Sequence, residues 1–296
     1  MTYKRCLIIV TLATVMFGCK KDRKIQSEMP ANTDTASVAV ADEEMAATRS
    51  DELNETDFEA DARTPRVCVY KFTDSDPIIL DEKDEVNERA VLLKGTKWAN
   101  GKTLKVFFMN GSPYLRNKVI TYARRWANHA NLHFVVTNKK AESDIRAGFK
   151  INGDKGSWSY FGKDADRYRK GKQTMNFGWF NRKTEDSELI RTTIHEFGHS
   201  IGLAHEHLSP VNTINWDKPK VYDYYMGPPN NWTREKVNEQ VLNKYKPRDV
   251  RNTKYDPLSI MHYPVDPSLT TDGQAVGVNW TLSDKDKTFI RRIYPN

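Results

Sequence analysis

The stretch from His195 to Glu206 restricts the fold of this chain more than any other part of its sequence. His195 and His199 are four residues apart, so on a helix both imidazoles lie on one face and can reach one metal ion. Gly202 can end that helix in a left-handed conformation, and the chain can then bring His205 back toward the ion. Three imidazoles leave the fourth position of a tetrahedral zinc ion open for water, as a catalytic zinc site requires. The stretch therefore predicts a helix, a turn and a zinc centre.

The spacing of these residues makes coincidence a poor explanation. The pattern His-Glu-x-x-His alone is expected by chance in on the order of one chain in a hundred of this length. Gly202, His205 and Glu206 at their fixed spacing lower that frequency to well under about one in ten thousand. The alternative is that His195, His199 and His205 are structural histidines of an ordinary helix.

Two further segments accompany this motif, and together the three resemble one known family. The motif itself is similar to the extended zinc motif of metzincin metalloproteases, and Glu206 after the third histidine resembles the astacin branch. The sequence Ser-Ile-Met-His-Tyr at 259–263 is similar to the Met-turn of astacins, and residues 156–162 resemble the segment that lines their cleft. Residues 90–296 thus resemble a bacterial-type astacin-family zinc metalloprotease.

The resemblance implies a fold of the α+β class. In the metzincin zinc-protease fold, an N-terminal mixed twisted sheet with two long helices is followed by a C-terminal subdomain of loops and helices, and the active-site cleft lies between them. Local patterns in this sequence predict strands at Leu104–Met109, His133–Thr137, Ile145–Lys150 and Thr174–Phe177. They predict helices at Leu115–Ala130, from Ser187, at Thr233–Tyr245 and at Ser283–Tyr294.

The resemblance also implies one zinc ion per catalytic domain with three histidine ligands, His195, His199 and His205. Zinc lowers the pKa of a bound water from 15.7 toward about 7, and Glu196 is placed to take the proton as general base. Tyr263 would be a displaceable zinc ligand whose phenol then donates a hydrogen bond to the oxyanion, and the alternative is a packed core tyrosine. Met261 is expected to be structural, because a thioether is a weak zinc ligand beside three imidazoles.

Residues 1–19 have the pattern of an export signal. Lys4 and Arg5 precede the apolar run Cys6–Phe17, which has about half the roughly 20 residues that a membrane-spanning helix needs. The end of this run resembles a bacterial lipoprotein signal, in which Cys19 becomes the lipidated N-terminus. The alternative is an ordinary secretory signal with an incidental cysteine. We expect an exported precursor that is lipid-anchored to a bacterial membrane, secreted after processing, or both.

Charge is distributed unevenly along the rest of the chain. Residues 20–89 contain 10 Lys or Arg and 19 Asp or Glu, a net charge of −9, whereas residues 90–296 carry +14. Residues 20–62 are rich in small and acidic residues and are expected to form a flexible tether, and 63–89 an inhibitory pro-segment. The basic residues of 90–296 are scattered among acids and aromatics, which argues against a nucleic-acid partner.

Cys68 is the only thiol that remains once the signal is discounted. A thiolate binds zinc at about 2.3 Å and would displace the catalytic water. Resemblance to bacterial members of the family implies that Cys68 is a cysteine switch that keeps the precursor latent. Two alternatives stay open. Cys68 can be a buried and inert strand cysteine, or Asp74 or Asp76 can cap the zinc instead.

Processing is expected near Arg89/Ala90, because residues 89–93, aligned by Trp98, resemble the mature N-terminus of astacins. In that family the new ammonium group is buried near the glutamate after the third histidine, which here is Glu206. An ion pair of that kind would lock the domain in its active form. The alternative is a solvated Glu206.

The sequence as a whole predicts a secreted, monomeric zinc endopeptidase that acts on polypeptides and is made as a latent precursor. A protein of a different class remains as the alternative, namely a catalytically silent surface lipoprotein that binds polypeptides. Glu196 discriminates between the two, because a protein that only binds would be expected to lose the general base.

Overall fold

The computed structural model describes residues 68–71, 91–165, 171–251 and 254–296. All of them belong to one unit, residues 60–296. The expected signal and tether, the processing site, Cys19, Asp74 and Asp76 lie outside the described residues. Of the expected pro-segment, only 68–71 is described. Within the described ranges, no helix has both the length and the apolar character needed to cross a membrane.

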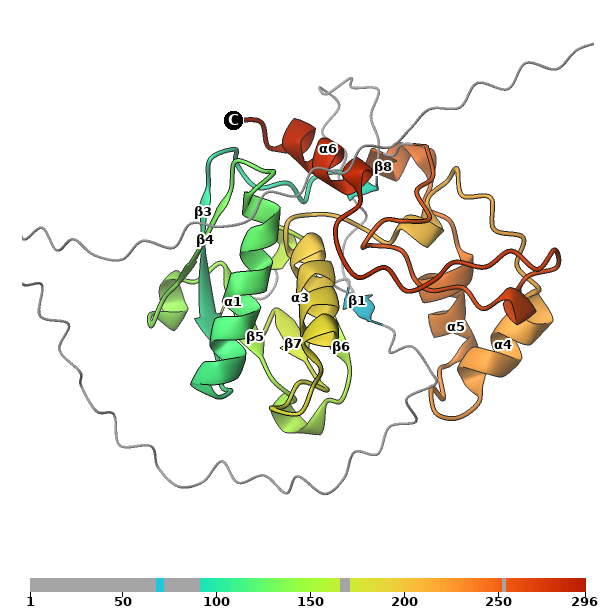
Figure 1. Cartoon of the computed structure of the whole chain (residues 1–296), viewed down its shortest axis with the longest axis horizontal. Coiled ribbons are helices and arrows are strands. Elements are labelled where there is room, and N and C mark those ends of the chain that lie inside the picture. The colour runs from blue at the N-terminus through green and yellow to red at the C-terminus, as the bar shows by residue number, and fades with distance from the viewer. Residues whose placement is uncertain (1–67, 72–90, 166–170, 252–253) are drawn as a thin grey trace, which may run out of the picture. The chain divides into compact units, whose positions relative to one another are not determined.

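A six-stranded sheet forms the first half of the domain, in the order β1-β6-β7-β5-β3-β4 (Figure 1). All neighbouring pairs are parallel except β6 and β7, which are antiparallel. The bounds are Val69–Lys71 (β1), Thr103–Phe108 (β3), His133–Val136 (β4), Ile145–Gly148 (β5), Ser157–Tyr160 (β6) and Met175–Phe177 (β7). Strand β1 comes from the expected pro-segment, so this segment covers the edge of β6.

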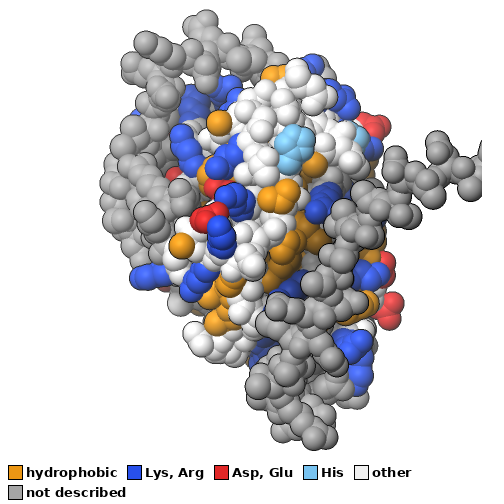
Figure 2. Space-filling model, turned by 90° about the vertical axis from the view of Figure 1, so that its left-hand side faces the viewer, with side chains coloured by type: hydrophobic (Ala, Val, Ile, Leu, Met, Phe, Trp, Pro, Cys, Tyr) orange, Lys and Arg blue, Asp and Glu red, His pale blue; other side chains and the backbone are white. Residues whose placement is uncertain are grey.

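The opposite edge of the sheet is formed by β4, where Val135 is 38% and Val136 is 54% exposed. Figure 2 views the molecule from this side and shows hydrophobic side chains gathered among Lys and Arg side chains. A second, two-stranded sheet pairs β2 (Leu92–Leu93) with β8 (Val250–Arg251). It ties the start of the expected catalytic domain to its C-terminal part.

Two long helices, α1 (Pro113–Ala127) and α3 (Asp186–Ser200), pack against each other. Helix α1 begins where the Ser112 hydroxyl accepts a hydrogen bond from Leu115 N, with Pro113 at the first turn. Its buried residues recur every three or four positions, and Trp126 Nε1 donates to Ile194 O of α3 at 2.8 Å. This contact fixes α1 against the middle of α3, where the zinc motif lies.

The C-terminal part contains short helices and extended loops (Figure 1). Its α-helices are α4 (Lys218–Met226), α5 (Arg234–Val237) and α6 (Asp284–Ile293). Helix α6 starts with a capping box, in which Ser283 and Asp286 each accept a hydrogen bond from the other's backbone N–H. The expected α+β class, with a mixed sheet and two long helices followed by loops and helices, is confirmed.

Some elements differ from the sequence predictions. The helix expected at Thr233–Tyr245 is only one turn of α-helix, and residues Asn238–Leu242 continue it as a π-helix. Helix α4 is not predicted by the sequence, because only Val221 and Tyr225 are buried in it and they mark a face too short to show a period. From the sequence we expect residues 156–162 to lie in a loop, but Ser157–Tyr160 form strand β6 and all four of its residues are buried.

Candidate active site

Helix α3 carries the first part of the zinc motif and ends as the sequence predicts. Asp186 and Glu188 place negative charge in its first turn, which stabilises the helix N-terminus. After Ser200, Gly202 adopts a φ of 99°, and Leu203 N donates back to Gly198 O at 2.9 Å. A Cβ atom at 202 would lie 2.8 Å from Thr96 Oγ1, so both the turn and the packing require glycine here.

The turn brings the three histidines together in the protein interior. His205 Nε2 lies 3.2 Å from His195 Nε2 and 3.1 Å from His199 Nε2, and all three side chains are buried. Two nitrogens bound at about 2.0 to 2.1 Å to one tetrahedral ion lie roughly 3.3 Å apart. The three nitrogens therefore fit a single zinc ion, and their contacts with one another are better explained by a shared ion than by hydrogen bonds.

Backbone carbonyls orient two of these imidazoles. His195 Nδ1 donates to Ile260 O at 2.8 Å, and His199 Nδ1 donates to Leu203 O at 2.7 Å. Each bond leaves the lone pair on Nε2, the atom that faces the other histidines. Burial lowers the pKa of His199 to about 4 and holds the pKa values of His195 and His205 well below their ordinary value. Neutral imidazoles are the form that binds zinc.

Glu196 follows His195 on α3 and is fully buried. Its carboxylate oxygens have no hydrogen-bonding nitrogen or oxygen partner in the described part of the chain. Burial raises the pKa of Glu196 to about 8, although the Cys68 thiol and the Arg191 guanidinium partly offset this by favouring the ionised form. Arg191 Nη2 lies 2.7 Å from Glu188 Oε1. The buried carboxylate beside His195 is therefore placed where it can take up and release a proton.

Residues 259–263 pass beneath and beside the histidines, as expected for a Met-turn. Met261 is buried and packs against α3 at Gly198. The two residues are so close that a Cβ atom added at Gly198 would lie 2.4 Å from Met261 Sδ. The Tyr263 ring centroid lies 4.3 Å from that of His205 and 4.2 Å from that of His207. The Tyr263 hydroxyl donates a hydrogen bond to the backbone carbonyl of Cys68.

Cys68 reaches the same place from the residue before strand β1. Its sulfur, one ring nitrogen of His195 and one oxygen of Glu196 all lie within 4.8 Å of one another. Burial and the negative charge of Glu196 raise the pKa of the Cys68 thiol well above its ordinary value. A metal ion would reverse this preference, because a coordinating thiol is deprotonated.

Glu206 lies behind the histidines and is also buried. Glu206 Oε1 accepts a hydrogen bond from Asp256 N at 2.9 Å, whereas Oε2 has no partner within the described residues. Burial, together with the charges of Asp286 and Asp256, raises the pKa of Glu206 well above its ordinary value. Lys285 Nζ, 3.6 Å from Asp256 Oδ1, is a cation beside this acidic group.

Sequence reasoning missed three buried residues around this site: Arg191, His207 and Asp286. Arg191 was open to prediction, because it precedes His195 by four residues and so lies on the same face of the helix. His207 Nε2 donates to Gln240 O at 2.8 Å rather than facing the other histidines. No local pattern in the sequence indicates that Asp286 lies near the Met-turn.

Comparisons with known proteins agree with this geometry. The sequence matches the family model Astacin, which describes a peptidase family, over residues 91–294. A structure of myroilysin is similar with a TM-score of 0.67 and 42% sequence identity, covering 70% of this chain and 99% of that chain. A crystal structure of myroilysin has a TM-score of 0.53 and 43% identity, covering 68% of this chain and 87% of that chain.

A third solved structure is more distant. High choriolytic enzyme 1, a hatching enzyme zinc-protease from Oryzias latipes (Medaka fish), is 18% identical with a TM-score of 0.45, covering 67% of this chain and 92% of that chain. The search of curated proteins found no match. The resemblance expected from the zinc motif is nevertheless confirmed, because the family model spans most of the sequence and the myroilysin structures share its fold. The chain belongs to the astacin family of zinc metalloendopeptidases.

Proposed function

We propose that residues 90–296 hydrolyse peptide bonds in polypeptides with one zinc ion held by His195, His199 and His205. The observation that carries this is the meeting of three buried Nε2 atoms at 3.1 and 3.2 Å beside the carboxylate of Glu196. Bound zinc would supply Lewis-acid activation of a water and of the peptide carbonyl.

The protein's own groups then move the protons and stabilise the developing charge. Glu196 takes a proton from the attacking water and returns it to the leaving amine, a role that the position of its buried carboxylate beside His195 supports. Tyr263, whose hydroxyl donates to a backbone carbonyl of the pro-segment, would donate in the same way to the substrate carbonyl as it gains negative charge. The second candidate, a lipoprotein that only binds polypeptides, gives no reason for a buried carboxylate here.

Casein hydrolysis by the processed protein tests this function. A chelator should abolish hydrolysis and added zinc should restore it, while Glu196→Gln should lower kcat by about a thousandfold with zinc still bound. Glu185→Gln, just before the same helix, is the matched control and should leave the rate unchanged. Full activity of Glu196→Gln, or a processed protein without stoichiometric zinc, would overturn the proposal.

We also propose that the protein is exported as a latent precursor, with residues 1–19 as signal and 63–89 as pro-segment. Three contacts support latency. Strand β1 pairs with β6, the Cys68 sulfur lies near His195 and Glu196, and the Tyr263 hydroxyl is engaged by Cys68 O. In this arrangement Cys68 would be the cysteine switch, because its thiolate would bind the zinc in place of the catalytic water.

Cys68→Ala in the unprocessed precursor separates the switch from its alternatives. The variant should hydrolyse casein without cleavage of the chain, while Asp74→Asn and Asp76→Asn should stay latent. If Cys68→Ala stays fully latent with zinc bound, Cys68 is an inert strand cysteine. Activity of either aspartate variant would instead identify an aspartate as the cap.

Processing near Arg89/Ala90 would place a new ammonium group next to Val91. Val91 is buried, and its carbonyl accepts a hydrogen bond from Ala204 N at 2.8 Å, two residues before Glu206. We propose that this ammonium pairs with Glu206, whose Oε2 lacks a partner among the described residues. N-terminal sequencing of the active form should therefore begin at or next to Ala90, and a distant start would exclude the pair.

Two further features of the precursor complete the proposal. Cys19 would carry the lipid that anchors the precursor to a bacterial membrane, so cleavage near Ala90 would release a monomeric enzyme. Mass spectrometry of the precursor tests this, because a lipidated Cys19 adds the mass of its acyl chains. An unmodified N-terminus would favour an ordinary secretory signal.

A further inference from the structure

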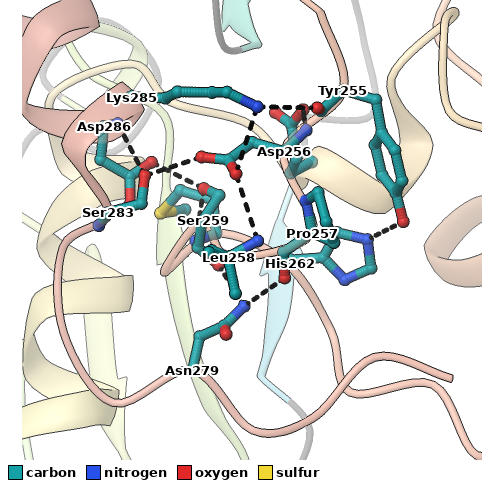
Figure 3. A network of polar contacts seen from close by, with 12 residues as sticks. Tyr255, Asp256, Pro257, Leu258, Ser259, His262, Asn279, Ser283, Lys285 and Asp286 are labelled. Carbon is teal, nitrogen blue, oxygen red and sulfur yellow. Dashed lines mark hydrogen bonds and ion pairs between the residues drawn. The ribbon is translucent and has the colours of Figure 1, made fainter. Parts of the chain in front are cut away.

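A buried carboxylate that the proposed chemistry does not use stands at the start of α6. Asp286 is 1% exposed and belongs to the capping box, where Asp286 Oδ2 accepts from Ser283 N at 2.9 Å. The same side chain also reaches the Met-turn. Ser259 Oγ donates to Asp286 Oδ1 at 2.7 Å (Figure 3). Ile260 N donates to Asp286 Oδ2 at 2.8 Å. A helix cap needs only the first of these three contacts.

The residue held by Asp286 also holds a zinc ligand. The backbone N–H of Ile260 donates a hydrogen bond to Asp286, and the backbone carbonyl of Ile260 accepts one from His195 Nδ1 at 2.8 Å. A carbonyl in this position sets the rotation of the imidazole and keeps the lone pair on Nε2. Asp286 is therefore joined to His195 by two hydrogen bonds and one residue of backbone.

The segment around Ile260 has no regular secondary structure, since residues 254–264 form neither helix nor strand. Turn hydrogen bonds run from Ser259 N to Asp256 O and from His262 N to Ser259 O, but neither involves the N–H of Ile260. Side chains add to these bonds, and Asn279 Nδ2 donates to Pro257 O and to Ser259 O, each at 2.8 Å (Figure 3). At Ile260 itself, the carboxylate of Asp286 accepts the backbone N–H.

We propose that Asp286 is a positioning residue for the metal site, which orients His195 through the Ile260 backbone. The inference rests on the proposed zinc site and adds a residue that is 91 positions away from His195 in the sequence. It predicts that loss of the carboxylate weakens zinc binding and changes the geometry around the metal, even in molecules that remain folded.

The test compares Asp286→Asn with two controls in the full chain. Ser283→Ala removes the cap hydroxyl, with its hydrogen bond to Asp256 Oδ2, and leaves the contacts of Asp286 with Ser259 and Ile260. Asp284→Asn changes an exposed carboxylate of the same helical turn. Zinc affinity is measured by competition with a chromophoric chelator, and the ligand field by the visible absorption of the cobalt(II)-substituted protein. Far-ultraviolet circular dichroism verifies that each variant is folded.

Asp286→Asn should bind zinc about tenfold more weakly and give an altered cobalt spectrum, whereas both controls should match the wild type. Wild-type affinity and an unchanged spectrum for folded Asp286→Asn would overturn the inference. If that variant does not fold, Asp286→Glu decides, because it keeps a carboxylate at the start of α6 but displaces it by one methylene from Ile260 N. An unchanged cobalt spectrum of Asp286→Glu would then overturn the inference. Failure of the wild type to bind zinc would instead refute the proposed function.

Discussion

Helix α3 brings His195, Glu196 and His199 into the site through the regular geometry of its own turns, whereas Met261 and Tyr263 reach the site on a segment without helix or strand. His195, Glu196 and His199 need only the helix to be placed correctly, and the turn at Gly202 adds His205 to them. Met261 and Tyr263 depend on side-chain hydrogen bonds from Asn279 and α6. The site therefore combines one locally encoded half with one half held by contacts distant in the sequence.

The two halves therefore suit different roles, one holding ligands rigidly and the other allowing a side chain to change its hydrogen-bond partner. A helix packed against α1 holds His195 and His199 rigidly, which suits side chains that would bind one ion together. A segment tied down at a few points leaves room for a side chain to change partners, which the proposed role of Tyr263 requires. In the structure the Tyr263 hydroxyl donates to the backbone carbonyl of Cys68, a partner that a substrate carbonyl would replace in the proposed mechanism.

The largest expected effect contrasts two neighbouring buried histidines. His205→Ala should lower zinc affinity by at least about 100-fold, because each ligand of a zinc site contributes several kcal/mol. His207→Ala should keep zinc, since His207 Nε2 donates to Gln240 O and its ring stacks on Tyr263. Zinc content after dialysis against a weak chelator measures both. Equal loss of zinc in the two variants would mean that the ligand set is not the one the motif predicts.

The next effect concerns the other half of the site. Tyr263→Phe should lower kcat of the processed enzyme by about 100-fold, the cost of one donor to a developing oxyanion, with KM and zinc content little changed. In the precursor, the same change removes the hydrogen bond to Cys68 O, so Cys68 should react faster with an alkylating reagent. Tyr255→Phe, which loses a bond to His262 Nε2, is the control. Unchanged kcat would make Tyr263 a packed core tyrosine.

The sequence predicted the first half of the site far better than the second. His195, Glu196, His199 and His205 follow from spacing alone, because a helix and one glycine turn place them without help from distant residues. The positions of Met261 and Tyr263 beside the histidines were expected only from the resemblance, since nothing within residues 259–263 indicates which helix they pack against. Asp286 could not be predicted, because its contact with Ile260 depends on how α6 folds back on the Met-turn.

The same limit applies to the fold. Strand β6 and helix α4 escaped prediction, because each is short and shows no clear period in its sequence. The long helices and β3 were predicted within a few residues, because amphipathic periods of several turns or of alternating residues are strong signals. Pairing of β1 with β6 is a long-range contact and no local pattern encodes it.

The third prediction concerns how the stability of the protein depends on pH through Asp286, which holds the Met-turn segment. Burial, with the charge of Asp256, raises the pKa of Asp286 to about 6 despite the hydrogen bonds from Ser259, Ile260 and Ser283. The folded state therefore binds the proton more tightly than the unfolded state, whose aspartates titrate near 3.9. This contribution to stability is present below about pH 4 and is lost as pH rises through about 6.

The shift of about two pKa units corresponds to about 3 kcal/mol. Asp286→Asn should therefore gain stability relative to the wild type by up to that amount between pH 4 and 7, whereas Asp284→Asn should show no such trend. Urea unfolding at several pH values measures the difference. A constant difference across this range would mean that the carboxylate has an ordinary pKa in the folded protein.

The smallest expected effect lies where the two halves touch. A Cβ atom at Gly198 would meet Met261 Sδ at 2.4 Å and Trp126 Cζ2 at 3.2 Å. Gly198→Ala should therefore lower the free energy of unfolding by about 2 kcal/mol, in the range typical of overpacked cores, as measured by urea unfolding. Gly277→Ala is the control, because a Cβ there meets no atom within 4 Å. If Gly198→Ala is as stable as the control, Met261 can move without cost, and the Met-turn is held by Asp286 and Asn279 rather than by its packing against α3.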